Sequence, residues 1–99
     1  MERYQIAADL RDGTGKGVAR KLRAAGRVPA IAYGKHVEKP INLSVGSHEL
    51  VTILSQPTGR YMPLDIMVGE EKYAAVIRDI QVHALTRKVR HIDFLLLKE

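Results

Sequence analysis

Apolar and polar residues alternate along several short segments of the chain, a period of two that is typical of β-strands with one buried face. In the first such segment, residues 3–10, the apolar positions are Tyr4, Ile6, Ala8 and Leu10. The same pattern predicts further strands at residues 30–33, 41–45, about 61–68, 72–82 and 89–97. The last strand should place Ile92, Phe94 and Leu96 in the core.

Two other segments have helical spacing. Residues 18–25 predict a short helix that ends at Gly26 and carries Arg20 and Arg23 on one polar face. Ser47 is a candidate N-cap for a second helix, which the proline and glycine of residues 57–59 should end. Residues 12–17 contain three glycines and predict a loop.

Many short strands with two short helices indicate the α+β class. We expect a small twisted antiparallel β-barrel with two short helices. The length of 99 residues suits a single domain, residues 1–99, with one modest core.

The composition narrows the function classes. The chain has no cysteine, which excludes disulfides and thiolate metal sites and fits a reducing, cytoplasmic location. Its four histidines lack ligand spacing, so we expect no metal site, and no motif calls for another cofactor. No apolar run reaches the roughly 18 residues that a membrane span needs, so we expect no membrane partner. We also expect the free protein to be a monomer.

Positive charge is concentrated at the two ends of the chain. Residues 1–40 carry a net charge of +5, residues 41–75 a charge of −2 and residues 76–99 a charge of +2. If the fold brings the ends together, they form a surface for a polyanion. The alternative is that these cations only make the surface soluble.

Lys16 lies among the glycines of the predicted loop, but a Walker-type phosphate loop has a different spacing and places Ser or Thr after the lysine. The segment is therefore either an ordinary turn or a loop that closes on a phosphate backbone. Arg11, Arg20 and Arg23 extend it into a cationic strip suited to phosphate or guanine contacts.

Near the end of the chain, His91 and Asp93 share the polar face of a predicted strand. Asp79 and Gln81 share one face of the preceding strand and would extend this polar patch if the strands pair. The patch has three interpretations: a catalytic or metal pair, a structural surface pair, or contacts to nucleic-acid bases. Tyr33, beside a glycine at a strand end, is either a core residue or an aromatic contact to RNA.

Four sequence features together resemble a known family. They are Arg11, the Gly-Lys-Gly of residues 15–17, the stretch ARKLRAAGRVPAIAYG of residues 19–34, and the His-Ile-Asp-Phe of residues 91–94. They are similar to the bacterial large-subunit ribosomal protein family numbered twenty-five, which binds 5S rRNA and is related to the general stress protein Ctc. Residues 44–75 carry no matching motif.

The resemblance implies a small β-barrel that binds the loop E region of 5S rRNA through the minor groove, as a structural component of the ribosome and not as an enzyme. It implies RNA contacts at Arg11, Arg23, Tyr33, His91 and Asp93; charge and placement add Lys16 and Arg20. Some family members carry a long second domain, and we expect the chain to correspond to the short form. The alternatives are an off-ribosome stress-related or anticodon-binding RNA module and, third, a hydrolase.

Overall fold

The computed structural model describes residues 4–11, 16–35, 37–56 and 62–97, which form six strands and two helices. In chain order they are β1 (Tyr4–Leu10), α1 (Lys16–Ala24), β2 (Arg27–Tyr33), β3 (Ile41–Gly46), α2 (Ser47–Leu54), β4 (Leu64–Val68), β5 (Glu71–Val82) and β6 (Val89–Leu96). None of the described helices is long and apolar enough to cross a membrane.

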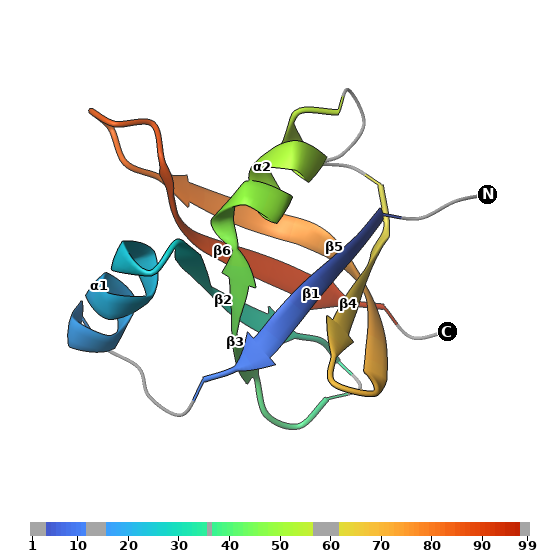
Figure 1. The fold of residues 1–99 in the computed structure, drawn as a ribbon. Coiled ribbons are helices and arrows are strands. Elements are labelled where there is room, and N and C mark those ends of the chain that lie inside the picture. The colour runs from blue at the N-terminus through green and yellow to red at the C-terminus, as the bar shows by residue number, and fades with distance from the viewer. Residues whose placement is uncertain (1–3, 12–15, 36, 57–61, 98–99) are drawn as a thin grey trace.

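The strands close into a barrel in the order β1-β3-β2-β6-β5-β4, which confirms the predicted barrel with two short helices (Figure 1). Neighbouring strands are antiparallel except in two places, where β1 runs parallel to β4 and β2 runs parallel to β6. The sequence pattern did not predict these parallel pairs. Each parallel pair joins strands that are far apart in the chain, so no hairpin-turn signal in the sequence predicts it.

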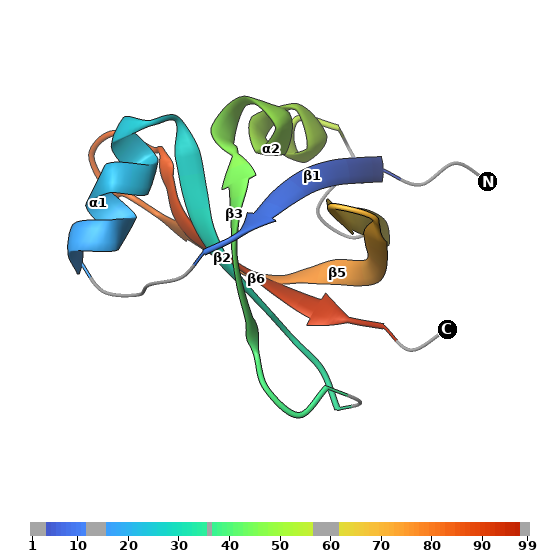
Figure 2. The same ribbon diagram turned by 60° about the horizontal axis from the view of Figure 1, so that its bottom comes forward.

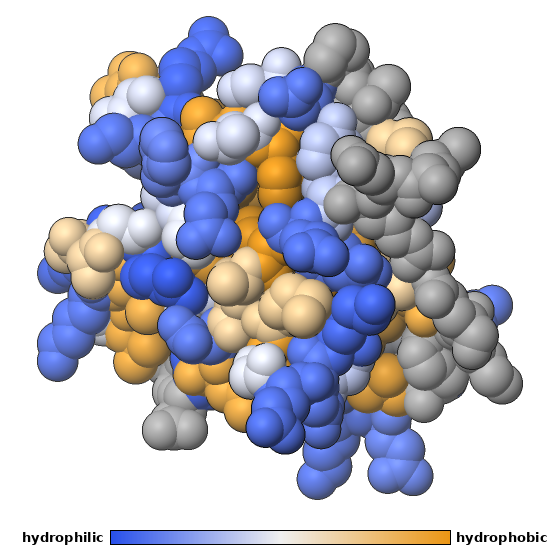
Figure 3. All heavy atoms as spheres, turned by 45° about the vertical axis from the view of Figure 1, so that its right-hand side comes forward, coloured by the Kyte–Doolittle hydropathy of each residue, from blue (hydrophilic) through white to orange (hydrophobic). Residues whose placement is uncertain are grey.

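Inward-facing side chains fill the barrel. Fully buried members include Phe94, Ile6, Leu43, Leu64, Ile66, Ile92, Val28 and Val45. α2 lies over one end of the barrel and contributes Leu50 and Ile53 to the same core, whereas α1 lies beside β2 (Figure 2). Figure 3 shows hydrophilic side chains over much of one flank, with hydrophobic residues in a strip near the middle and in patches along the lower edge.

Local details differ from the sequence prediction in three places. Leu10 is 65% exposed because β1 ends beyond the packed interior. α1 begins at Lys16, so the last two residues of the predicted loop are helical, while residues 12–15 lie outside the described part. The N-cap of α2 is Gly46 and makes no side-chain hydrogen bond, so the cap predicted at Ser47 is wrong. Gly26 after α1 has φ of +77°, as expected for a helix-ending glycine.

Two β-bulges interrupt the pairing of β5 with β6. Ile77 lies opposite Phe94 while Asp79 lies opposite Asp93, so Arg78 is an extra residue on β5. Closer to the hairpin turn, Gln81 lies opposite His91 but Val82 lies opposite Val89, and Arg90 is then the extra residue on β6. A bulge changes which face the following side chains occupy.

Candidate nucleic-acid interface

The outward face of β2, β6 and β5 carries most of the polar residues singled out in the sequence. The register places Gln81 opposite His91 and Asp79 opposite Asp93, which confirms that the two strands pair as the extended polar patch required. The bulge at Arg78 explains why Asp79 and Gln81 face outward. It lets Ile77 and Ile80 both pack against the core, and the residues that alternate with Ile80 then lie on the outer face.

His91 and Asp93 form the closest polar pair on this face. His91 Nδ1 lies 3.0 Å from Asp93 Oδ1, and the two side chains are 28% and 27% exposed. The contact is a close approach of the groups without an aligned hydrogen bond, since Nδ1 has no hydrogen-bond partner. Asp79 on β5 lies opposite Asp93 on β6, so two carboxylates lie side by side on the polar face. Carboxylates accept from amino groups and repel phosphates.

No group of three or more His, Cys, Asp or Glu side chains in the described residues could hold a metal ion. The carboxylates around His91 and Asp93 are acceptors of the kind that base amino groups need. The imidazole of His91 beside them can donate, accept or stack.

Beside this face lies a hollow of about 400 Å³ that we call the arginine hollow. Its lining residues come from five different elements or their ends and are Arg11, Ala19, Arg23, Pro29, Gln81, Arg90 and His91. Three arginines therefore line one concave site with no carboxylate among the lining residues. Such a site suits an anion or a group rich in hydrogen-bond acceptors.

Arg11 is the most constrained member of the hollow. Its backbone N–H donates to the carbonyl of Asn42 over 3.1 Å, and its Nη2 donates to the carbonyl of Ala30 over 3.2 Å. Its Nε is buried and has no hydrogen-bond partner. Burial also lowers the pKa of Arg11 below its ordinary value, because desolvation disfavours the charged form.

The remaining predicted residues lie around the hollow. Arg20 is exposed on α1 and lines an adjacent groove. Tyr33 is half-buried at the end of β2, two residues beyond Ile31, the partner of Asp93, and so belongs to the polar face but not to the hollow. Lys16 begins α1, and its side chain lies outside the described part.

Arg90 is a member of the hollow that the sequence interpretation missed. It has the same parity as Ile92 and Phe94, so simple alternation assigns it to the core. The bulge at this residue breaks that alternation, and Arg90 is exposed. The sequence signal that could have identified Arg90 was its positive charge at the position immediately before His91.

Arg27, the first residue of β2, makes its contacts within the fold. Its Nη2 donates to Asp9 Oδ2 over 2.9 Å and to the carbonyl of Ser44 over 2.8 Å. These bonds join β2 to β1 and β3, so we assign Arg27 a structural role.

A small barrel with a concave cluster of arginines beside a polar strand face is typical of the small β-barrel modules that bind nucleic acid. The family comparison is more specific. The model of the Ribosomal L25p family matches residues 6–94, and the chain belongs to this family.

Individual relatives agree with this result. The chain is 40% identical over 94 residues to a large ribosomal subunit protein bL25 of Halothermothrix orenii, covering 95% of the chain and 43% of the relative. It is 41% identical over 95 residues to that of Citrifermentans bemidjiense, covering 94% and 48%. For Leifsonia xyli the identity is 33% over 97 residues, covering 98% and 46%. The chain therefore spans a little under half the length of these relatives.

Proposed function

We propose that this chain is a structural, non-catalytic component of the large ribosomal subunit that binds 5S rRNA. Membership of the Ribosomal L25p family supports the ribosomal part of the proposal, as do the names of the relatives. We propose that residues 1–99 act as one RNA-binding unit, monomeric when free, that works in the cytoplasm on the ribosome without a cofactor.

The observation that carries the RNA-binding part is the state of Arg11. Its guanidinium is partly desolvated, and its Nε lacks a partner. An unpaired buried donor costs about 1–3 kcal/mol, and more on a charged group. A phosphate or a base acceptor in the arginine hollow would provide the missing partner, with Arg23 and Arg90 beside it.

We assign two kinds of contact to the interface. Lys16, Arg20 and Arg23 hold phosphates of the RNA backbone and set its position. The polar face of Asp79, Gln81, His91 and Asp93, with Tyr33 beside it, contacts base edges. In the minor groove the guanine amino group is the distinctive donor, and a carboxylate accepts from it. The loop E region of 5S rRNA is the proposed target.

The test compares the affinity of the chain for 5S rRNA with its affinity for a transfer RNA, as wild type and as Arg11→Met. The wild type should prefer 5S rRNA by at least tenfold. Arg11→Met should lose most of that preference while its melting temperature stays nearly unchanged, because methionine keeps much of the packing and removes a desolvated charge. Equal affinity of the wild type for both RNAs would contradict the proposal.

Sedimentation tests the ribosomal part separately. The protein should travel with the large subunit through a gradient at moderate salt. Recovery only in the slow fractions, with intact 5S rRNA binding, would favour an RNA module that works off the ribosome.

A further inference from the structure

The hairpin between β5 and β6 extends beyond the barrel next to α1 (Figure 1). Its turn and flanking residues carry Arg87, Lys88 and Arg90, and all three side chains are exposed. Arg87 and Lys88 belong to none of the contacts proposed above, whereas Arg90 also lines the arginine hollow.

The turn is held in one conformation by its own hydrogen bonds. His83 Nδ1 accepts from the backbone N–H groups of Leu85 and Thr86, each over 3.2 Å. The backbone N–H of His83 donates to the carbonyl of Lys88 over 2.9 Å, and the N–H of Arg87 donates back to the carbonyl of His83 over the same distance. Lys88 is thus presented from a preorganised turn.

Arg87 has φ of +63° in this turn, a left-handed conformation that favours glycine. The strain of about 1–2 kcal/mol is offset by the surrounding hydrogen bonds.

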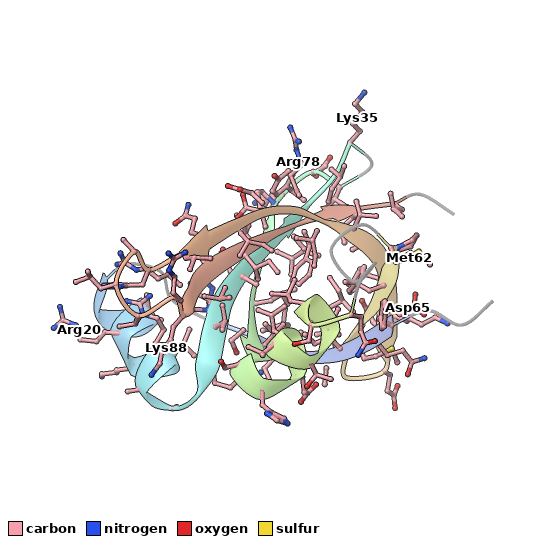
Figure 4. All side chains as sticks on the ribbon, turned by 90° about the horizontal axis from the view of Figure 1, so that it is seen from above. Arg20, Lys35, Met62, Asp65, Arg78 and Lys88 are labelled. Carbon is pink, nitrogen blue, oxygen red and sulfur yellow. The ribbon has the colours of Figure 1, made fainter. Side chains whose placement is uncertain are left out.

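A groove of about 410 Å³ separates the hairpin from α1. Its lining residues are Arg20, Arg23 and Ala24 on the helix side and His83, Thr86, Lys88, Val89 and Arg90 on the hairpin side. Four of these side chains are permanent cations, and none is a carboxylate. Figure 4 shows Arg20 and Lys88 on the same flank of the molecule, far from Met62 and Asp65 at the other end.

The groove adjoins the arginine hollow, since Arg23 and Arg90 line both. A polyanionic chain that passes from the groove to the hollow therefore stays next to positively charged side chains. The phosphodiester backbone of RNA has the repeated negative charges that such a pair of sites requires.

We propose that the groove between α1 and the β5–β6 hairpin is a second, sequence-independent binding site for RNA backbone phosphates, with Lys88 and Arg90 as its hairpin ligands. The inference rests on the proposed function and adds a contact surface to it. His83 is a positioning residue that acts through the turn.

The test measures affinity for 5S rRNA at several salt concentrations for Lys88→Ala and for a matched control, Lys72→Ala. Lys72 is also an exposed lysine, but it lies at the start of β5, the end of the strand remote from the hairpin turn. Lys88→Ala should lower the slope of log affinity against log salt by about 0.7–0.9, the contribution of one phosphate. It should weaken binding to 5S rRNA and to a transfer RNA by the same factor, and Lys72→Ala should leave both unchanged.

A second pair of variants tests the turn. His83→Ala removes the acceptor for two backbone donors and should weaken RNA binding with little change in melting temperature. His83→Asn should restore binding, because an asparagine oxygen can accept from the backbone N–H two residues on. Wild-type binding with identical slopes for Lys88→Ala and Lys72→Ala would overturn the groove alone. Failure of the wild type to bind 5S rRNA would overturn the proposed function, and the groove proposal with it.

Discussion

Along β6 the side chains alternate between the barrel interior and the polar outward face. Ile92 and Phe94 are fully buried, and Phe94 is the largest residue of the core. His91 and Asp93 point to the other face and form their 3.0 Å pair there. Neighbouring residues of one strand therefore serve stability and, in our proposal, recognition.

Mutations in this strand should separate the two roles. Phe94→Ala should lower the free energy of unfolding by about 3–5 kcal/mol, a large part of the stability of a small domain. Asp93→Ala should change it by only about 0.5 kcal/mol, because the carboxylate is partly exposed and faces Asp79 across the strand pair. Thermal melting of both variants provides the measurement.

The same Asp93→Ala variant should weaken 5S rRNA binding by about 1–3 kcal/mol if Asp93 accepts from a base amino group. The salt slope should stay at its wild-type value, since Asp93 neutralises no phosphate. A variant that unfolds, or one that binds normally while folded, would show that our assignment of Asp93 to base contacts is wrong.

At the scale of elements, Arg27 joins three strands of the barrel. Its guanidinium contacts Asp9 on β1 and both the carbonyl and the hydroxyl of Ser44 on β3. Ser44 is buried, so the hydroxyl gains a partner in a site with little access for water. A lysine cannot reproduce this forked geometry.

Arg27→Ala should therefore lower the free energy of unfolding by about 1–3 kcal/mol, the usual cost of leaving buried polar groups unpaired. Its effect on the salt slope of RNA binding should be close to zero. Arg23→Ala gives the matched contrast, because Arg23 lines the arginine hollow and has no assigned intramolecular partner among the described contacts. It should keep the stability and reduce the slope by about 0.7–0.9. The reverse result for the two arginines would contradict the division of roles.

At the scale of the whole molecule, closure of the barrel brings the two basic ends of the sequence together. β2 lies beside β6 and α1 beside the β5–β6 hairpin, so Arg11, Arg20 and Arg23 from the first part of the chain share one surface with Lys88 and Arg90 from the last part. The middle of the chain, with its negative net charge, supplies β3, α2 and β4.

Binding to 5S rRNA should therefore depend steeply on salt. If about four phosphates are neutralised, log affinity should fall by about 3 for each tenfold rise in salt. Titrations between low and moderate ionic strength measure this slope, with a neutral osmolyte as the control for general solvent effects. An affinity that stays constant across the series would exclude the charged surface as the main source of binding.

The sequence by itself determined the elements of this protein, because alternation and glycine placement are local signals. They predicted each of the six strands, the helix that ends at Gly26 and the buried side of β6. They also placed Asp79 with Gln81, and His91 with Asp93, on polar strand faces, and the register of β5 with β6 brings these two pairs together.

Only the tertiary structure decided how these pieces meet. The parallel pairings of β1 with β4 and of β2 with β6 depend on long-range closure, which no local pattern encodes. The two bulges arise from the pairing of β5 with β6 and shift the alternation of side chains between the two faces. As a result, Asp79 and Gln81 face outward, and Arg90 does not join Ile92 and Phe94 in the core. The unpaired Nε of Arg11 is likewise a product of the tertiary structure, because burial of this atom depends on how the chain packs around it. Local sequence specifies what each strand can bury, whereas the register between distant strands specifies which charges stand together.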